Sequence, residues 1–255
     1  IRLEPNWRLQ NMKKLLLVSF LALAVAAGAF ADVQNHPRTA LQEAVVPHST
    51  GGATGFCSIV YYDLCSGWLW TYSGWALGDE PGVAFDLPND CGKLPGEECT
   101  NTGFWWYWRY TIPTYGFTVS YDLYELDVNF CKAGPSLGNI SGYDPVERWN
   151  FHYGLGAVTS DWAALIASYD SGSLPRFCTD NNNANFAAPL ACPGYAIGPI
   201  QTYYWGGPTT QYCPPQYFAD GYGAVDCLMD AGWDCQPSGT STEDASWSGV
   251  KSLFR

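Results

Sequence analysis

Two neighbouring segments carry aromatic and charged side chains in an arrangement suited to ligand recognition. Residues 104–112 (FWWYWRYTI) place an unbroken apolar set at even positions, and residues 117–124 (FTVSYDLY) place one at odd positions. Rings beside charged groups suit a sugar, because pyranose C–H faces pack on rings while hydroxyls need polar partners. The remaining positions of both segments form a mixed set that includes Trp105, Tyr107, Arg109, Asp122 and Tyr124.

The spacing of these two segments predicts a hairpin. A four-residue loop at 113–116 joins them so that core residues face core residues, while Tyr107 faces Asp122 on the other side. A slip of one residue would break both matches, because side chains alternate between the faces of a strand. We therefore expect two adjacent strands, with Trp106 buried and Trp105 turned outward.

A third segment, RWNFHY at 148–153, alternates in the same manner. Its pattern predicts that the aromatic residues point inward, namely Trp149, Phe151 and Tyr153. The polar residues that then point outward and extend the surface include Asn150 and His152. Cover by loops 88–102 or 178–198 and a subunit interface are alternative interpretations of this face. The expected ligand-binding residues are Trp105, Tyr107, Arg109, Asp122, Tyr124, Asn150 and His152.

Catalytic motifs are scarce. His152 is the single histidine of residues 56–235, and no serine lies in a G-x-S-x-G turn, which disfavours a triad hydrolase. H-E-x-x-H is absent, and Gly-x-Gly pairs lack the third glycine of a nucleotide-binding loop. Glycoside hydrolysis needs two carboxylates in a cleft, so a hydrolase is an open alternative. Its candidate carboxylates are Asp122, Glu125, Asp127 and Glu147.

The run TDNNN at 179–183 offers oxygen ligands that suit calcium. Its spacing differs from that of an EF-hand loop, and runs of Asp and Asn are typical of turns. We expect no cofactor, with calcium at this run as the alternative.

The N-terminal part resembles a secretory signal. Lys13 and Lys14 precede an apolar run that ends near Ala27, and the small-residue pattern up to Ala31 offers a cleavage site. We interpret residues 12–31 as a signal peptide and residues 1–11 as translation upstream of the natural start. Since no second long apolar stretch follows, we expect a secreted or cell-surface protein without a membrane span.

The ten cysteines all follow this segment, where oxidation is permitted and an even number suits pairing. We expect about five disulfides, with Cys91–Cys99 and Cys178–Cys192 as attractive short closures. Seven residues separate the closest cysteine pairs, a spacing that disfavours zinc. The cysteines are Cys57, Cys65, Cys91, Cys99, Cys131, Cys178, Cys192, Cys213, Cys227 and Cys235.

The acidic composition excludes one class of partner. The formal net charge is −12, and removal of residues 1–31, which carry +3, leaves −15. Such a surface repels phosphate backbones, so we expect no nucleic-acid partner. Basic clusters that would hold the chain on anionic lipid are also missing.

Alternating apolar segments between Gly, Pro and Asn clusters predict an all-β fold of eight or nine strands. We expect one antiparallel β-sandwich, jelly-roll or Greek-key in its connections, over residues 56–235. A flexible arm at 32–55 is expected before it, and a linker and tail at 236–255 after it. Residues 161–169 fit either a short helix or a strand, and we favour the strand.

The stretch YYDLCSGWLWTYSGWALGDEPGVAFD at 61–86 resembles the start of Trp- and Cys-rich exported hypothetical proteins of uncultured bacteria. The ending TSTEDASWSGVKSLFR is similar to surface-sorting tails of such organisms. The resemblance implies export and a compact β domain, and it brings no established activity. We expect a secreted or surface binding module, with carbohydrate as its ligand. A structural surface component and a glycoside hydrolase are the alternatives.

Overall fold

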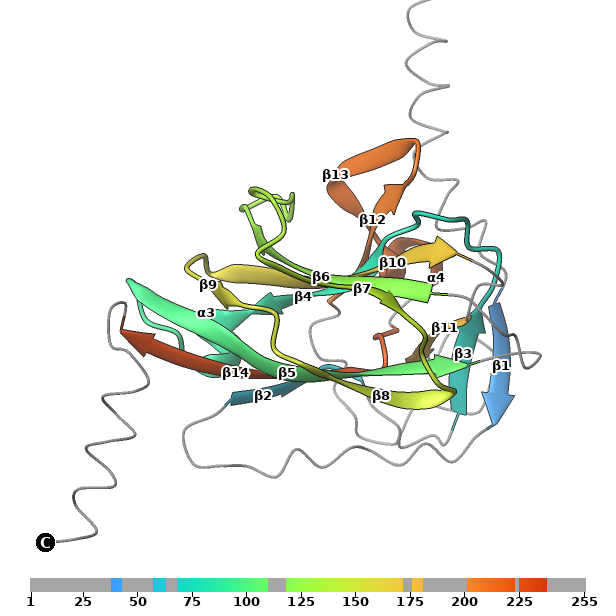
Figure 1. Ribbon diagram of the computed structural model, residues 1–255, viewed down its shortest axis with the longest axis horizontal. Helices are drawn as coiled ribbons and strands as arrows, with labels where there is room; N and C mark the ends of the chain where they lie inside the picture. The colour runs from blue at the N-terminus through green and yellow to red at the C-terminus, as the bar shows by residue number, and fades with distance from the viewer. Residues whose placement is uncertain are drawn as a thin grey trace, which may run out of the picture.

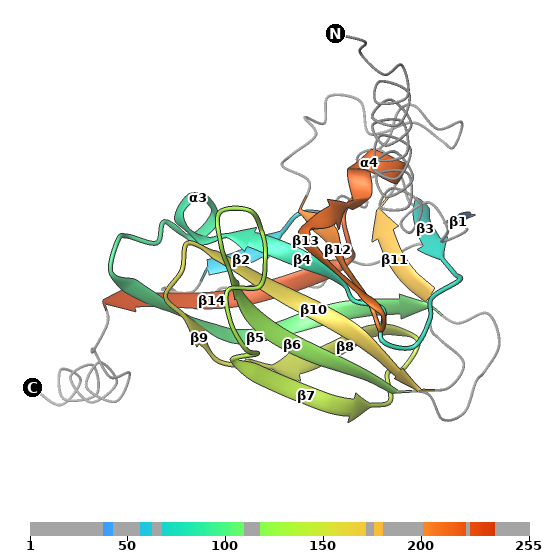
Figure 2. The same cartoon turned by 90° about the horizontal axis from the view of Figure 1, so that it is seen from above.

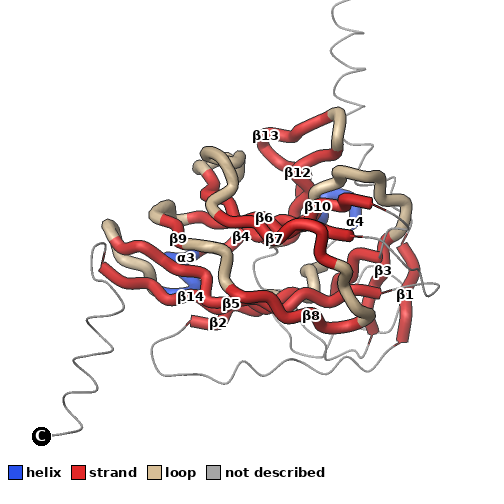
Figure 3. Tube along the Cα trace, viewed as in Figure 1, coloured by secondary structure: helices blue, strands red, loops and turns tan. Residues whose placement is uncertain are grey.

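The protein is built from two antiparallel β-sheets packed face to face, as the computed structural model shows (Figure 1). Within the described part of the chain, helix is confined to two short segments, α3 (Leu87–Cys91) and α4 (Phe218–Tyr222) (Figure 3). The predicted disulfide-stapled antiparallel β-sandwich is confirmed. The structure describes residues 38–42, 57–62, 68–109, 118–171, 176–180, 201–222 and 225–237.

The first sheet is organised around the long strand β5, which pairs with several neighbours along its length. The short strands β8 (Arg148–Tyr153) and β9 (Ala157–Val158) pair with β5 on the side away from β14. The main path of the sheet runs through β1 (Arg38–Gln42), β3 (Trp68–Tyr72), β11 (Arg176–Asp180), β5 (Glu97–Arg109), β14 (Met229–Pro237) and β2 (Cys57–Val60).

The second sheet has strands from both halves of the chain side by side. Residues 161–169, which fitted either a helix or a strand, lie mostly within the central strand β10, so the predicted strand is confirmed. The order of this sheet is β13 (Thr210–Tyr217), β12 (Thr202–Gly207), β4 (Pro81–Asp86), β10 (Trp162–Ser171), β6 (Thr118–Leu126) and β7 (Gly138–Tyr143).

The predicted hairpin between β5 and β6 is wrong, because β5 belongs to the first sheet and β6 to the second. Their apolar faces nevertheless meet across the interior. The rings of Trp106 and Tyr121 lie 5.5 Å apart, and Trp108 Nε1 donates to the Tyr121 hydroxyl at 2.7 Å. Alternation determines which side of a strand faces the core, and facing strands of two sheets satisfy it as well as a hairpin does.

The core between the sheets is strongly aromatic. Trp106 and Trp108 are fully buried and stack at 5.5 Å, and Trp75 stacks on Tyr169 at 5.2 Å. The expected burial of Trp106 is thus confirmed. Rings of this size bury large apolar areas, each contributing roughly 2–3 kcal/mol relative to exposure, so this layer dominates the packing energy.

The alternation predicted for β8 is reversed. Its register with β5 sets His152 opposite Phe104 and Phe151 opposite Trp105, so the polar residues face the core and the aromatic ones face outward. Asn150 tolerates this burial because its amide donates to Val146 and Arg148 carbonyls, both at 2.8 Å. These bonds tie Asn150 to the connection between β7 and β8. A pattern of apolar residues does not predict such polar contacts.

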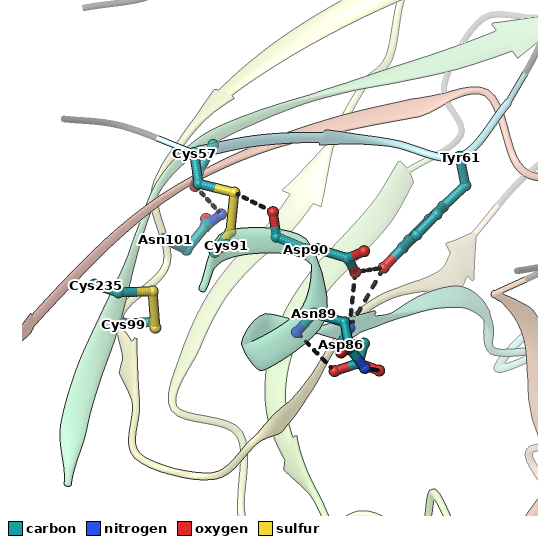
Figure 4. The surroundings of a disulfide bond; sticks show 10 residues. Cys57, Tyr61, Asp86, Asn89, Asp90, Cys91, Cys99, Asn101 and Cys235 are labelled. Carbon is teal, nitrogen blue, oxygen red and sulfur yellow. Dashed lines mark hydrogen bonds between the residues drawn. A yellow bond between two sulfur atoms is a disulfide. The ribbon is translucent and has the colours of Figure 1, made fainter. Parts of the chain in front are cut away.

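Three disulfides fasten the described part of the chain. Cys57–Cys91 joins β2 to α3, Cys99–Cys235 joins β5 to β14, and Cys131–Cys213 joins the loop after β6 to β13. Figure 4 shows the first two beside Tyr61, whose hydroxyl donates to the Asp90 carboxylate. That contact holds α3 against the end of β2.

Complete pairing of the ten cysteines is a wrong prediction. Cys227 carries a buried thiol, and Cys91 and Cys99 are bonded to other cysteines than each other. Cys227 packs in the main core and Cys178 packs in a smaller cluster on the outer side of the sheet. Cys65 and Cys192 lie outside the described residues.

The N-terminal arm contributes to the sandwich. Residues 38–42, expected to be loosely held, form β1 and pair with β3 from Arg38 to Gln42. The expected signal peptide and most of the tail lie outside the described residues. Within the described ranges, no helix combines the length and apolar character needed to cross a bilayer.

Replacing Tyr121 by Phe is expected to destabilise the protein by about 1–3 kcal/mol, because the buried Trp108 N–H loses its acceptor. Urea unfolding followed by tryptophan fluorescence measures this difference. Tyr124→Phe removes the same atom from the outer face of β6 and should change stability by less than about 0.5 kcal/mol. Equal losses in the two variants would contradict the interior contact between the sheets.

Candidate functional site

The structure separates the predicted ligand-binding residues. Trp105, Tyr107 and Arg109 lie on the outer face of the first sheet, with Arg109 ion-paired to Glu147. Asp122 and Tyr124 lie on the outer face of the second sheet, on the opposite side of the sandwich. Asn150 and His152 are buried between the sheets. The prediction of a single surface is wrong, because it relied on the hairpin that does not form.

Two of these residues, Tyr107 and Tyr124, pack against neighbouring side chains of the protein. Tyr107 is 2% exposed and belongs to a small outer cluster formed by Tyr62, Leu69, Tyr107, Cys178 and Leu228, with Trp149 against it. Tyr124 lies under the Lys132 ammonium, 4.5 Å from the ring centre, and Lys132 also pairs with Glu80 at 2.7 Å. Burial raises the pKa of Tyr124 to about 12. This part of the outer face is therefore a second small core around Tyr107.

A groove opens where the edge strands β7 and β8 diverge at the rim of the sandwich. Figures 1 and 2 show these two strands along the same edge, joined by a short connection. The groove has a volume of about 540 Å³, within the range typical of small-ligand sites. The residues that line this β7–β8 groove are Gly138, Asn139, Ile140, Tyr143, Phe151, His152, Tyr153, Gly154 and Leu155.

Three rings extend from the groove across the outer face, and we call them the ring row: Tyr153, Phe151 and Trp105. Tyr153 is 80% exposed and lies 5.2 Å from Phe151, which is 42% exposed and lies 5.0 Å from Trp105. A Cβ at Gly103 would lie 3.1 Å from the Phe151 ring, so glycine leaves room for that ring over the sheet. The arrangement offers flat apolar surface to a ligand that enters the groove.

Polar groups border the same groove. Asn139 donates its amide to Asp122 at 3.0 Å, and the Tyr143 hydroxyl donates to Asn150 at 3.4 Å. Asp122 and Asn150, two of the predicted site residues, therefore contact residues that line the groove without lining it themselves. Burial lowers the pKa of His152 to about 4, so its ring is neutral at neutral pH, and its buried Nε2 has no hydrogen-bond partner.

A second polar feature lies on the strand next to Trp105, the last ring of the ring row. Asp230 pairs with Trp105 across the β14–β5 ladder and with Val60 across the β14–β2 ladder. Its side chain is fully buried, with the Tyr62 hydroxyl as the neighbouring hydrogen-bonding group. Burial raises the pKa of Asp230 to about 6, an effect that the nearby Tyr62 hydroxyl opposes.

The carboxylates considered for glycoside hydrolysis are held by local contacts. Glu125 accepts hydrogen bonds from Thr159 and Ser160, which outweigh the effect of burial and lower its pKa. A lowered pKa is the opposite of what a general acid needs. Asp127 accepts from Asn129 and Cys131 backbone N–H groups, and Glu147 pairs with Arg109.

Metal binding finds little support. Within the described ranges, no three His, Cys, Asp or Glu side chains come close enough to share a metal ion. Asp180, from the run considered for calcium, is buried and accepts the Asp226 N–H at 2.8 Å. Residues 181–183 of that run lie outside the described residues.

Several groove residues had no place in the expected site. Tyr153 and Phe151 were assigned to the core, while Asn139 and Tyr143 lie in GNISGY, a strand with too little apolar alternation to be recognised. The Asn150 side chain accepts from the Val146 N–H and donates to the Val146 and Arg148 carbonyls, and these contacts became apparent only with the tertiary structure.

The fold and the groove define a disulfide-stapled antiparallel β-sandwich with an aromatic groove at one edge. Comparison with family models, with curated proteins and with solved structures finds no match to this chain.

Replacing Asp230 by Asn is expected to stabilise the protein at high pH. The folded pKa of about 6 exceeds the ordinary 3.8, so the stability that protonation provides is present below pH 4 and is lost as pH rises through 6. The variant should gain on the order of 3 kcal/mol at pH 8 and less than about 1 kcal/mol at pH 4. Chemical denaturation at both pH values measures the gain.

Asp234→Asn, on the same strand, is the control for the change in net charge, because Asp234 accepts a hydrogen bond from Gln236. Its effect should be small and the same at both pH values. A pH-independent gain in Asp230→Asn would show that the buried carboxylate does not carry the expected cost.

Proposed function

We propose that this protein is an extracellular binding protein that holds a glycan in the β7–β8 groove. The observation that carries the proposal is a groove of about 540 Å³ whose wall includes a tyrosine ring that is 80% exposed. Large exposed rings beside a concavity are typical of ligand sites, since a folded chain otherwise buries such side chains.

The chemistry of the lining supports a sugar. Tyr153 and Phe151 offer ring faces for pyranose C–H groups, and an aromatic side chain loses little conformational entropy when it is immobilised. Asn139 and Tyr143 bring an amide and a hydroxyl to the same groove. This combination of flat apolar faces and neutral hydrogen-bonding groups suits a polyhydroxylated ligand better than a fully apolar one.

Export is part of the proposal. Three disulfides in the described part of the chain are typical of proteins that fold in an oxidising environment. The predicted signal peptide at 12–31 agrees with that location. A structural surface component remains the second candidate, because the exposed rings at the β7–β8 edge could equally join subunits.

Replacing Tyr153 by Ala is expected to weaken glycan binding at least about tenfold, since an aromatic anchor contributes roughly 1–2 kcal/mol. The glycan comes from an array screened with the oxidised wild-type protein, and calorimetry then measures the affinity of each variant. The melting temperature should change by less than about 2 °C, because an exposed ring contributes little to folding.

Leu94→Ala is the matched control, because Leu94 is 61% exposed and lies outside the groove. It should leave affinity unchanged. Equal affinity of wild type and Tyr153→Ala for the array ligand would refute the groove as the glycan site. Concentration-dependent self-association that Tyr153→Ala abolishes, with no glycan bound, would favour the subunit interface.

A further inference from the structure

The imidazole of His152 is a buried polar group in the wall of the β7–β8 groove. Its ring lines the groove and is 4% exposed, and its buried Nε2 has no hydrogen-bond partner within the described part of the chain. Burial lowers the pKa of His152, and no hydrogen bond contributes to that shift. Buried polar groups are normally hydrogen-bonded, because a missing partner lowers stability. The groove wall therefore contains a polar group that a ligand could satisfy.

Three aromatic rings hold this imidazole in place. Its centre lies 4.8 Å from the ring centre of Phe104, 4.3 Å from that of Tyr121 and 4.4 Å from that of Tyr143. These rings belong to β5, β6 and β7, so both sheets contact the imidazole. A half-turn about the Cβ–Cγ bond exchanges nitrogen and carbon positions and keeps the outline of the ring, so a nitrogen can face the groove while these contacts persist. The wall thus presents a preorganised group, which loses little entropy when a ligand binds.

Two other polar groups of the lining already have protein partners. Asn139 donates its amide to Asp122 at 3.0 Å, and Tyr143 donates its hydroxyl to Asn150 at 3.4 Å. A neutral imidazole has one N–H donor and one acceptor nitrogen, and a sugar hydroxyl both donates and accepts. A ligand hydroxyl therefore matches either nitrogen of His152.

The charge of the groove favours an uncharged ligand. The described side chains that line it are all uncharged at neutral pH, because burial lowers the pKa of His152 to about 4. The net charge of −12 repels anionic sugars, and none of these lining residues carries a carboxylate that would pair with an amino sugar. A charged sugar would lose water in this groove without gaining an ionic partner.

We propose that the ligand of the groove is a neutral glycan, one hydroxyl of which hydrogen-bonds to the His152 imidazole while a sugar face packs on Tyr153. This inference rests on the proposed function, which it narrows to a ligand class and a residue that determines specificity. The contact supplies the partner that the buried imidazole lacks. A site built around a hydroxyl also discriminates strongly against a ligand that lacks a hydroxyl at that position.

The test compares neutral and charged tetrasaccharides by calorimetry at pH 7.5. The neutral probes are cellotetraose, maltotetraose, mannotetraose and any neutral glycan retained on the array, and the charged probes are a galacturonic acid tetramer and a glucosamine tetramer. Wild type should bind at least one neutral probe, and bind it more tightly than either charged one. His152→Phe should lower the affinity for that probe about tenfold or more, because the buried sugar hydroxyl loses its partner.

Stability distinguishes a ligand contact from a structural role of the imidazole. His152→Phe keeps an aromatic ring at the same place and removes a buried polar group, so its melting temperature should equal or exceed that of wild type. His152→Gln offers an amide donor and acceptor, so it should bind the neutral probe more tightly than His152→Phe does. Tyr124→Phe is the matched control and should leave the affinity unchanged, because Tyr124 lies on the outer face of the second sheet, outside the groove.

The outcomes separate this inference from the proposed function. A lower melting temperature of His152→Phe would show that the imidazole stabilises the fold, and would overturn its assignment to the ligand. Tyr153-dependent binding that stays within about twofold in His152→Phe would overturn the hydroxyl contact and leave the glycan groove standing. Tighter binding of either charged tetramer than of every neutral probe would overturn the neutral ligand class. No binding of any tetramer, and no Tyr153-dependent glycan on an array, would overturn both proposals.

Discussion

The structure depends on the contact between the aromatic faces of β5 and β6 inside the sandwich. Trp106 and Trp108 from the first sheet meet Tyr121 from the second, and the buried hydrogen bond from Trp108 aligns the two strands. Rings of this size need complementary neighbours at close-packed density, so this contact determines which way both strands face. Every neighbour of β5 then inherits its alternation from that choice.

The groove follows from this constraint. Because β8 pairs with β5, its inward positions lie next to Phe104 and Trp106, and the chain fills them with His152 and Asn150. Asn150 is satisfied by the backbone around it, which bends the chain between β7 and β8. The large rings of β8 are left on the outer side. An exposed aromatic row and an open edge thus share one cause, which is the register of β8 on β5.

Asp230 is a buried carboxylate whose protonation is shifted by burial. Burial raises the pKa of Asp230 to about 6 despite the Tyr62 hydroxyl beside it, so its ionised form destabilises the folded state at neutral pH. Asp79, another buried carboxylate, accepts from the Tyr204 hydroxyl at 2.7 Å, and Asp226 accepts from the Gln201 N–H at 2.9 Å.

By itself, the sequence determined the all-β class, most strands and the inward faces of β5 and β6, because alternation of period two records burial directly. It also implied disulfides, though Cys227 remains a thiol. Only the tertiary structure decided that β5 and β6 lie in different sheets, and that Tyr153 faces outward while His152 faces inward. Pairing partners are set by contacts between residues distant in the chain, and two polar side chains satisfied or sheltered in the core can invert a local pattern.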